Sequence, residues 1–309
     1  MSGLYSGANA NVTKTALDKV FFQQYAAVPG PQISFAGDEM VFMQDSADNA
    51  AVIMENFKGV GLWEDTPEQA EYKGDDPLVT DQITFSVARF TKKFHISEEM
   101  EEDDQHSVVR RAIAQMGMKA KVSQNIKAFE TYRNAASSTL TSDGVALLSA
   151  SHQNIEGDTI DNTISGAFSV DTVEEGINLL LVQKDQAGDI IGHEAKTLLV
   201  PNQLYKEATE VLESTLEANT TDNQLNVYSH KYGIVLRQSQ YIGAAQGGKD
   251  DHFFMMGEYH SVMRWVRIPI RTKLLSGDFQ ENGDAVYRGR YREVYGAISY
   301  EALVGYEGV

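Results

Sequence analysis

The sequence predicts an α+β protein, in which strands and helices occupy separate stretches of the chain. Residues 78–97 alternate apolar and polar side chains with the two-residue period of a strand, and residues 97–133 change to helical spacing. Residues 272–303 return to alternation and predict a closing hairpin. With 309 residues, the chain is long enough to bury a core in two modest domains or one elaborate domain.

The composition argues against several classes of function. The chain has 26 Lys and Arg against 44 Asp and Glu, which gives a net charge of −18. This balance argues against tight nucleic-acid binding, because such binding depends on basic groups that neutralise phosphates. The absence of cysteine excludes disulfides, thiolate zinc sites, iron–sulfur clusters and cysteine nucleophiles. No apolar run approaches the roughly 20 residues needed to cross a bilayer, and no signal peptide is visible, so we expect a soluble protein of cytoplasmic origin.

The first 35 residues are predicted to form an arm. One short amphipathic segment, TALDKVFFQQYAAV, is followed by Pro29, Gly30 and Pro31, which end any helix. A compact domain rarely begins in this way, whereas an arm that lies across a neighbouring molecule often does.

A long β-hairpin follows, with a loop at its tip. Its flanks are predicted strands at 40–57 and 78–97, and the loop between them has the sequence KGVGLWEDTPEQAEYKGDDP. This loop contains one of the two tryptophans and a cluster of acids, and it has too little apolar content to fold by itself. In the second flank the apolar positions change faces after Ala88, which predicts a bulge or a twist there.

Residues 97–133 predict one long helix. Ser97 is a suitable N-cap, acids crowd the first turns and bases lie later, as the helix dipole favours. A continuous helix of about 37 residues would be about 55 Å long, against roughly 50 Å for a compact sphere of this chain length. We therefore expect a flat or elongated molecule. Gly117 is the position where this helix is most open to a kink.

The second half of the chain mixes helices and strands without a βαβ array. A second helix is predicted at 169–185 with Asp171 as its cap, and a buried strand at 196–201 runs into a helix at 202–215. Further strands are expected before the closing hairpin, at 226–229, 233–243, 252–257 and 263–270.

The sequence offers no convincing catalytic, cofactor or metal site. The seven histidines lack metal-ligand spacing, and the acidic run with a histidine at 250–252 is better explained as a solvated turn. Ser149 and Ser151 lie beside His152, but no G-x-S-x-G elbow is present, which favours a structural loop.

Three alternate arginines stand out near the C-terminus. Arg288, Arg290 and Arg292 line one face of a predicted strand. They suit either a phosphate group or acids from a neighbouring molecule, and the sequence leaves both possibilities open.

Four segments in a fixed order carry a family resemblance: DGVALLSASHQN, KTLLVPNQLYKEATEVL, YGIVLRQSQYI and RYREVYGAISYEALVG. With the arm, hairpin and long helix, they make the chain resemble the major capsid protein of tailed bacteriophages with the Hong Kong 97 fold. More specifically, the chain resembles the Mu-like prophage major head subunit family. The resemblance implies this division: 1–54 N-terminal arm and first β segment, 55–95 extended hairpin loop (E-loop), 96–196 peripheral (P) domain with a spine helix, 197–265 axial (A) domain, and 266–309 return to the P domain.

The resemblance also implies a function and its partners. It implies self-assembly into pentamers and hexamers of an icosahedral shell around packaged double-stranded DNA, with no enzymatic activity and no cofactor. The implied partners are other copies of the chain, portal and scaffolding proteins, and a decoration protein where one exists. The implied location is the virion, after assembly in the bacterial host cytoplasm. Three alternatives stay open: an encapsulin-like nanocompartment shell protein, a phage tail or sheath subunit, and an enzyme centred on His152.

Trp63 is the sharpest candidate for a contact between subunits. We expect it to anchor the loop on a neighbouring subunit, and the alternative is packing against its own hairpin. Arg89, Lys92 and Lys93, at the base of the hairpin, are expected to pair with acids, including acids of an adjacent subunit. The predicted contact residues are Trp63, Lys58, Lys73, Arg89, Lys92, Lys93, Arg288, Arg290 and Arg292.

Two lysines of the hairpin are included because of the family. In the founding member of the fold, a lysine on the E-loop bonds covalently to an asparagine of a neighbour, with a glutamate as catalyst. Lys58 and Lys73 are the lysines available for this bond here, although the sequence identifies no partner asparagine or glutamate.

Overall fold

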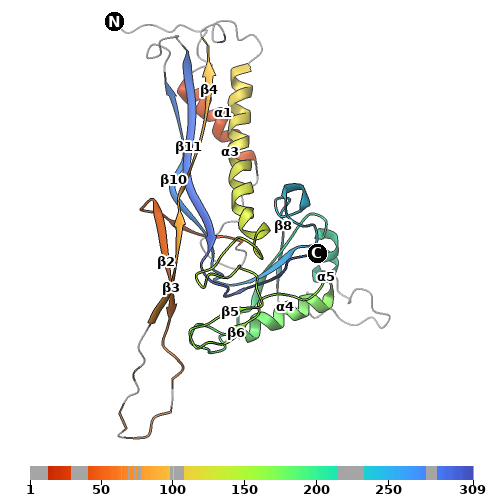
Figure 1. Cartoon of the computed structure of the whole chain (residues 1–309). Coiled ribbons are helices and arrows are strands. Elements are labelled where there is room, and N and C mark those ends of the chain that lie inside the picture. Colours follow the sequence, from red (N-terminus) through yellow and green to blue (C-terminus); the bar gives the residue numbers. More distant parts are fainter. Residues whose placement is uncertain are drawn as a thin grey trace.

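The structure is a computed structural model that describes residues 13–28, 41–63, 65–68, 70–71, 74, 78–97, 100, 108–213, 233–275 and 284–308. Figure 1 shows a long body of helices and extended strands, a second body built on a shorter sheet, and a hairpin that projects away from both. The elongated shape follows from the length of the strands and of one helix that runs along them. The α+β class predicted from the sequence is confirmed.

The long body is built on a four-stranded sheet with the order β1-β10-β11-β4. β10 (Val262–Leu275) and β11 (Ala285–Ala297) are the long antiparallel strands of the predicted closing hairpin. β4 (Ala88–Ile96) pairs with β11 and forms one edge, and β1 (Met43–Ser46) pairs in parallel with β10 at the other edge. The single predicted strand at 40–57 is therefore split, because its first part joins this sheet.

Two helices cover one face of the long sheet. α3 (Val108–Arg133) runs along it, and α1 (Lys14–Ala27) packs against α3. α3 has 26 described residues, and positions 98–99 and 101–107 of the predicted helix lie outside the described residues. At the predicted start, the Ser97 hydroxyl accepts a hydrogen bond from the Met100 N–H at 3.2 Å, as an N-cap does. The core between helices and sheet contains Leu17, Phe21, Ile96, Val109, Ile113, Ala285 and Tyr287.

Gly117 does not kink α3, which continues through it. A Cβ atom at this position would overlap the backbone carbonyl of Phe21. The glycine therefore lets α1 approach α3 closely, which is a common reason for glycine inside a helix.

The second body is built on a sheet with the order β12-β9-β7-β8. β7 (Ala195–Val200), β8 (Val235–Gln238) and β9 (Phe253–Gly257) match three predicted strands, and β12 (Leu303–Tyr306) joins them from the C-terminus. β7 is buried at five of its six positions, as its continuous apolar run predicts. The strand predicted at 226–229 lies outside the described residues.

Helices α4 (Val170–Val182) and α5 (Tyr205–Glu213) pack on this second sheet. The cap of α4 is Ser169 and not Asp171, so that prediction is wrong by two residues. The Ser169 hydroxyl accepts from the Thr172 N–H, and the Thr172 hydroxyl accepts from the Ser169 N–H. Asp171 lies in the first turn, where the helix dipole favours a carboxylate.

The projecting hairpin consists of β2 (Ala51–Lys58) and β3 (Leu78–Ser86), which pair antiparallel up to Lys58 and Leu78. Val87 separates β3 from β4, where the sequence predicts a change of face. On the β3 side, Phe85 stacks on Trp265 with ring centroids 4.8 Å apart, whereas β4 buries Ile96 in the core under α1 and α3. The short elements β5 (His152–Gln153), β6 (Thr159–Ile160) and η2 (Ala244–Gln246) lie in connecting loops.

The predicted domain limits at residues 196 and 265 stay proposals. α4 lies before the first limit and β12 after the second, yet both share a core with β7 and β9. None of the described helices combines the length and apolar character that a membrane crossing requires.

Candidate functional site

His152, from the candidate catalytic cluster of the sequence, is a buried structural residue. His152 Nδ1 lies 2.7 Å from Asp143 Oδ2, and Nε2 lies 3.3 Å from the carbonyl oxygen of Leu147. The Ser149 and Ser151 hydroxyls contact each other at 2.9 Å instead of the ring. Burial raises the pKa of Asp143, but hydrogen bonds from His152, Thr141 and a backbone N–H lower it below its usual value. This arrangement holds a loop and leaves His152 no free nitrogen to act as a base.

The run at 250–252 is structural as well. Asp250 accepts a hydrogen bond from the Ala244 N–H at 2.8 Å, and His252 is buried. Among the described residues, no group of three or more His, Asp and Glu side chains has the arrangement of a metal site.

The long sheet gathers most of the predicted contact residues on the face opposite α3. Arg288 is directly opposite Lys93 of β4 and Lys273 of β10. Arg290 is opposite Arg271, and Arg292 is opposite Arg89. Because directly opposed residues in an antiparallel pair share a face, these seven side chains form one surface. We call it the basic face: Arg89, Lys93, Arg271, Lys273, Arg288, Arg290 and Arg292.

The basic face has no compensating charge in the described chain. Six of its side chains are exposed and Arg292 is half-buried, and none of the seven forms an ion pair with a described residue. Glu293, the neighbouring acid on β11, is buried on the other side of the sheet. Like charges placed directly opposite each other on a sheet are destabilising. The isolated subunit thus carries four unfavourable cross-strand pairs in a protein whose net charge is −18.

On the buried side of the sheet, the acid Glu293 is paired with a basic side chain. Glu293 Oε2 accepts from Arg264 Nη2 at 2.7 Å and from the Gln124 amide at 3.3 Å, and Gln124 in turn accepts from the Tyr25 hydroxyl. This chain of contacts joins β10, β11, α3 and α1. Burial lowers the pKa of Arg264, but the neighbouring Tyr295 and the carboxylate of Glu293 raise it above its usual value.

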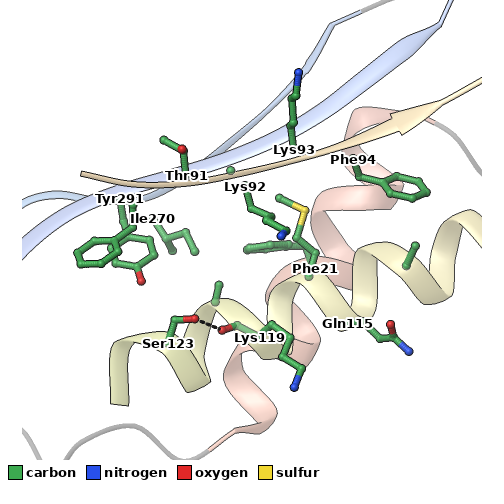
Figure 2. A pocket seen from close by; sticks show the side chains of 15 residues that line it. Phe21, Thr91, Lys92, Lys93, Phe94, Gln115, Lys119, Ser123, Ile270 and Tyr291 are labelled. Carbon is green, nitrogen blue, oxygen red and sulfur yellow. Dashed lines mark hydrogen bonds between the residues drawn. The ribbon is translucent and has the colours of Figure 1, made fainter. Parts of the chain in front are cut away.

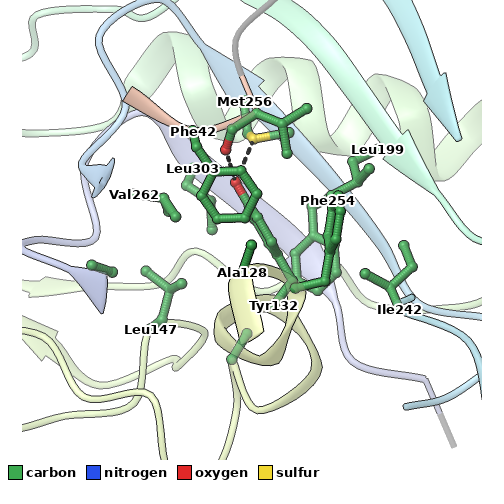
Figure 3. Close-up of a cluster of buried hydrophobic side chains, with 14 of the residues drawn as sticks. Phe42, Ala128, Tyr132, Leu147, Leu199, Ile242, Phe254, Met256, Val262 and Leu303 are labelled. Carbon is green, nitrogen blue, oxygen red and sulfur yellow. Dashed lines mark hydrogen bonds between the residues drawn. The ribbon is translucent and has the colours of Figure 1, made fainter. Parts of the chain in front are cut away.

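Lys92 lies on the helix side of β4, away from the basic face, since successive strand residues point to opposite faces. It lines a groove of about 680 Å³ between β4 and α3. Figure 2 shows Lys92 and Phe94 of β4 on one side of this groove and Gln115, Lys119 and Ser123 of α3 on the other. The lining is mainly apolar, with Phe21, Ile270 and Tyr291 at its base.

The loop of the hairpin exposes large apolar side chains. Trp63 is 98% exposed and Leu62 is 75% exposed, so Trp63 does not pack against its own hairpin. Asp65, Glu68 and Glu71 on the same loop are also exposed. In contrast, the other tryptophan, Trp265, is 1% exposed.

Of the two candidate cross-linking lysines, only Lys58 lies among the described residues. Lys58 forms an ion pair with Glu156 of the same chain, which ties the loop end of the paired strands β2 and β3 to the loop between β5 and β6. Lys73 lies outside the described residues. The covalent bond stays a prediction for both.

Sequence reasoning missed Arg271 and Lys273 as members of the basic face. The signal was present as alternation in the stretch RTK, but membership depends on the register with β11. It also grouped Lys92 with Lys93, although their side chains serve different surfaces.

The comparison with known proteins agrees with this architecture. Residues 80–305 match the family described as "Phage capsid protein". No curated protein sequence matches the chain. Among solved structures, the mature capsid of bacteriophage PhiM1 aligns at a TM-score of 0.55 with 11% identity, over 89% of this chain and 87% of that one.

Two further structures are similar over almost the whole chain. The capsid of cyanophage Pam1 has a TM-score of 0.55 and 14% identity over 92% of each chain. A virus-like particle from Pyrococcus furiosus has a TM-score of 0.51 and 11% identity over 94% of this chain and 98% of that one. At such identities these structures establish the fold, and the family match establishes the membership. The chain is a major capsid protein of the Hong Kong 97 fold and belongs to the phage capsid protein family.

Proposed function

We propose that this capsid protein assembles into pentamers and hexamers of an icosahedral shell that encloses packaged double-stranded DNA. The family match favours this role over an encapsulin-like nanocompartment shell and over a tail or sheath subunit. The proposed role is structural and rests on contacts between copies of the chain.

The observation that carries the proposal is the unpaired basic face on an elongated subunit with an exposed apolar loop. Seven basic groups without described acidic partners favour an acidic surface of a second molecule. Trp63 and Leu62 expose apolar area that would be buried in a contact. A contact that joins different surfaces of identical subunits is heterologous, and such contacts form rings when the rotation closes. Pentamers and hexamers are rings of this kind.

The other proposed partners follow from the role. A portal, a scaffolding protein and, where present, a decoration protein would bind the shell, which is built in the bacterial host cytoplasm and remains in the virion. We propose that the DNA is enclosed without being gripped, because a net charge of −18 per subunit repels it. This requires the basic face to be covered by neighbours and not to line the interior. A reconstruction of the particle with the basic face open to the lumen would contradict it.

The test is the particle itself. Purified full-length chain is expected to form round shells in negative-stain electron micrographs, and tubes would support a tail subunit instead. Deletion of residues 60–76 is expected to leave a soluble protein that forms no closed shells. Replacement of 60–76 by a glycine-serine segment of equal length separates the effect of the side chains from that of loop length. Normal particles from both variants would refute the role of the loop.

A further inference from the structure

We propose that the basic face binds the outer face of α4 in a second copy of this chain. The inference rests on the proposed self-assembly and names the surface that supplies the acids. We define the outer face of α4 by its exposed side chains: Asp171, Glu174, Asn178, Leu181 and Val182. They recur at intervals of three to four residues, so they lie along one side of the helix.

The N-terminal half of this outer face is acidic. Asp171 and Glu174 are exposed, and neither forms an ion pair with a residue that the structure describes. In contrast, two other acids of the second body, Glu194 and Glu210, have lysine partners in the same chain. The carboxylates of α4 are therefore available to cations of another molecule.

The C-terminal half of the outer face is apolar and continues into the next segment of the chain. The His193 N–H donates a hydrogen bond to the carbonyl oxygen of Leu180 at 2.9 Å, which holds that segment beside the end of α4. Four large apolar side chains are exposed here: Leu181, Val182, Ile190 and Ile191. A group of exposed apolar side chains with polar residues around it is typical of a protein–protein contact.

The two surfaces match in charge and in length. Asp171 and Asn178 are about 10 Å apart along the helix axis, and Arg288 and Arg292 are about 13 Å apart along β11. The helix can therefore lie along the strand with its carboxylates over the arginines, as electrostatic complementarity favours. The next alternate position of β11, Val294, is half-buried and offers apolar surface to the C-terminal half of α4.

The contact must be between copies. In Figure 1, α3 lies on the side of the long sheet that looks toward the second body, where α4 lies. The basic face is opposite α3 and is therefore turned away from α4 of its own subunit. Two different surfaces of one subunit then give a heterologous contact, in which each copy presents its α4 and receives another.

An exchange of charges tests the pairing. Arg290→Glu and Glu174→Arg are each expected to lower the yield of closed shells in negative-stain micrographs at least tenfold. Together they restore opposite charges across the contact and are expected to recover at least half of the wild-type yield. The matched control combines Arg290→Glu with Glu68→Arg, which reverses an exposed acid of the hairpin loop, and is expected to give no recovery.

Disulfide trapping tests the same contact with every charge in place, because the chain has no cysteine of its own. We pair Asn178→Cys with Thr91→Cys, since Thr91 is exposed and directly opposite Arg290 on the basic face. The control pairs Asn178→Cys with Gln115→Cys on the exposed side of α3. Under mild oxidation of assembled particles, the first pair is expected to give a ladder of covalent oligomers on non-reducing gels, at least tenfold stronger than the control.

Each outcome bears on one of the two proposals. Equal recovery from the two charge exchanges, or no recovery from either with folded subunits, overturns the contact and leaves the shell function intact. Wild-type shells together with no ladder from the first cysteine pair, or with equal ladders from both pairs, do the same. If the charge-reversed chains fail to fold, the trapping result decides. Absence of shells from the wild-type chain overturns the proposed function itself.

Discussion

Removing Arg288 should stabilise the isolated subunit while it weakens the shell. Arg288 is directly opposite two cations, Lys93 and Lys273, so Arg288→Thr relieves two like-charge pairs and introduces a residue that suits a strand. Cross-strand pairs contribute roughly 0.2–1 kcal/mol each, which gives a gain of about 1 kcal/mol for the pair of contacts at low salt. For a chain of this size that corresponds to a rise in melting temperature of roughly 2 °C.

The assay separates the subunit from the shell. Thermal unfolding is followed by circular dichroism in the variant that lacks residues 60–76, which keeps the subunits unassembled under the proposed function. Lys273→Thr serves as the graded comparison, because it relieves one pair and should give about half the gain. Both gains should shrink in 1 M salt, where the Debye length falls to about 3 Å. In the full-length chain, light scattering should show slower and less complete assembly for Arg288→Thr.

The expected result is a higher melting temperature of the unassembled subunit together with slower assembly of the complete chain. A lower melting temperature for Arg288→Thr at every salt concentration would show that the arginines stabilise the subunit itself. Faster assembly would show that the basic face repels its neighbours. Either result would refute the reasoning.

Three further predictions concern other parts of the fold. Gly117→Ala should lower the free energy of unfolding by about 1–3 kcal/mol in urea titrations, because the new Cβ overlaps the Phe21 carbonyl, whereas Gly59→Ala, with no atom within 4 Å, should be nearly neutral. Tryptophan emission should shift to the blue when the chain assembles, and the shift should vanish in Trp63→Phe, because Trp265 is already buried; a shift that persists in Trp63→Phe would exclude docking of Trp63. Burial raises the pKa of Asp18, but hydrogen bonds from Lys14, Thr272 and Tyr287 lower it below 3.8. The ionised Asp18 carboxylate therefore stabilises the fold above pH 3.8, and this stabilisation is lost as the pH falls through the pKa that Asp18 has in the folded protein. Asp18→Asn should therefore show a smaller loss of stability than the wild type between pH 5 and pH 3 in urea titrations, and equal losses would contradict this role.

The elements with a clear period were predictable from sequence. The strand at 78–97, the buried run before Pro201 and the long helix each carry a pattern that their own residues determine. The cap of α4 was not predictable in the same way. Ser169 and Asp171 are both good capping residues, and only the hydrogen bonds with Thr172 decide between them.

The candidate site was predictable only in part, because it depends on register between distant strands. Arg89 and Arg292 are more than 200 residues apart, and their apposition follows from the pairing of β4 with β11. The role of Gly117 was not predictable from sequence either. It depends on the close approach of the Phe21 carbonyl, which belongs to a different helix. The exposure of Trp63 also needed the structure, since a tryptophan in a loop is compatible with both exposure and packing.

The distribution of charge explains how such a subunit can be soluble alone and still assemble. A net charge of −18 makes subunits repel one another as their surfaces approach to within about a Debye length, before specific contacts form. At contact distance the arrangement matters instead, and seven basic groups are gathered on one face of the long sheet while the chain as a whole is acidic. Repulsion at long range then disfavours random aggregation, and attraction appears only in orientations that place acids over the basic face. The like-charge pairs in the sheet cost the isolated subunit some stability, and the proposed contact is what removes that cost.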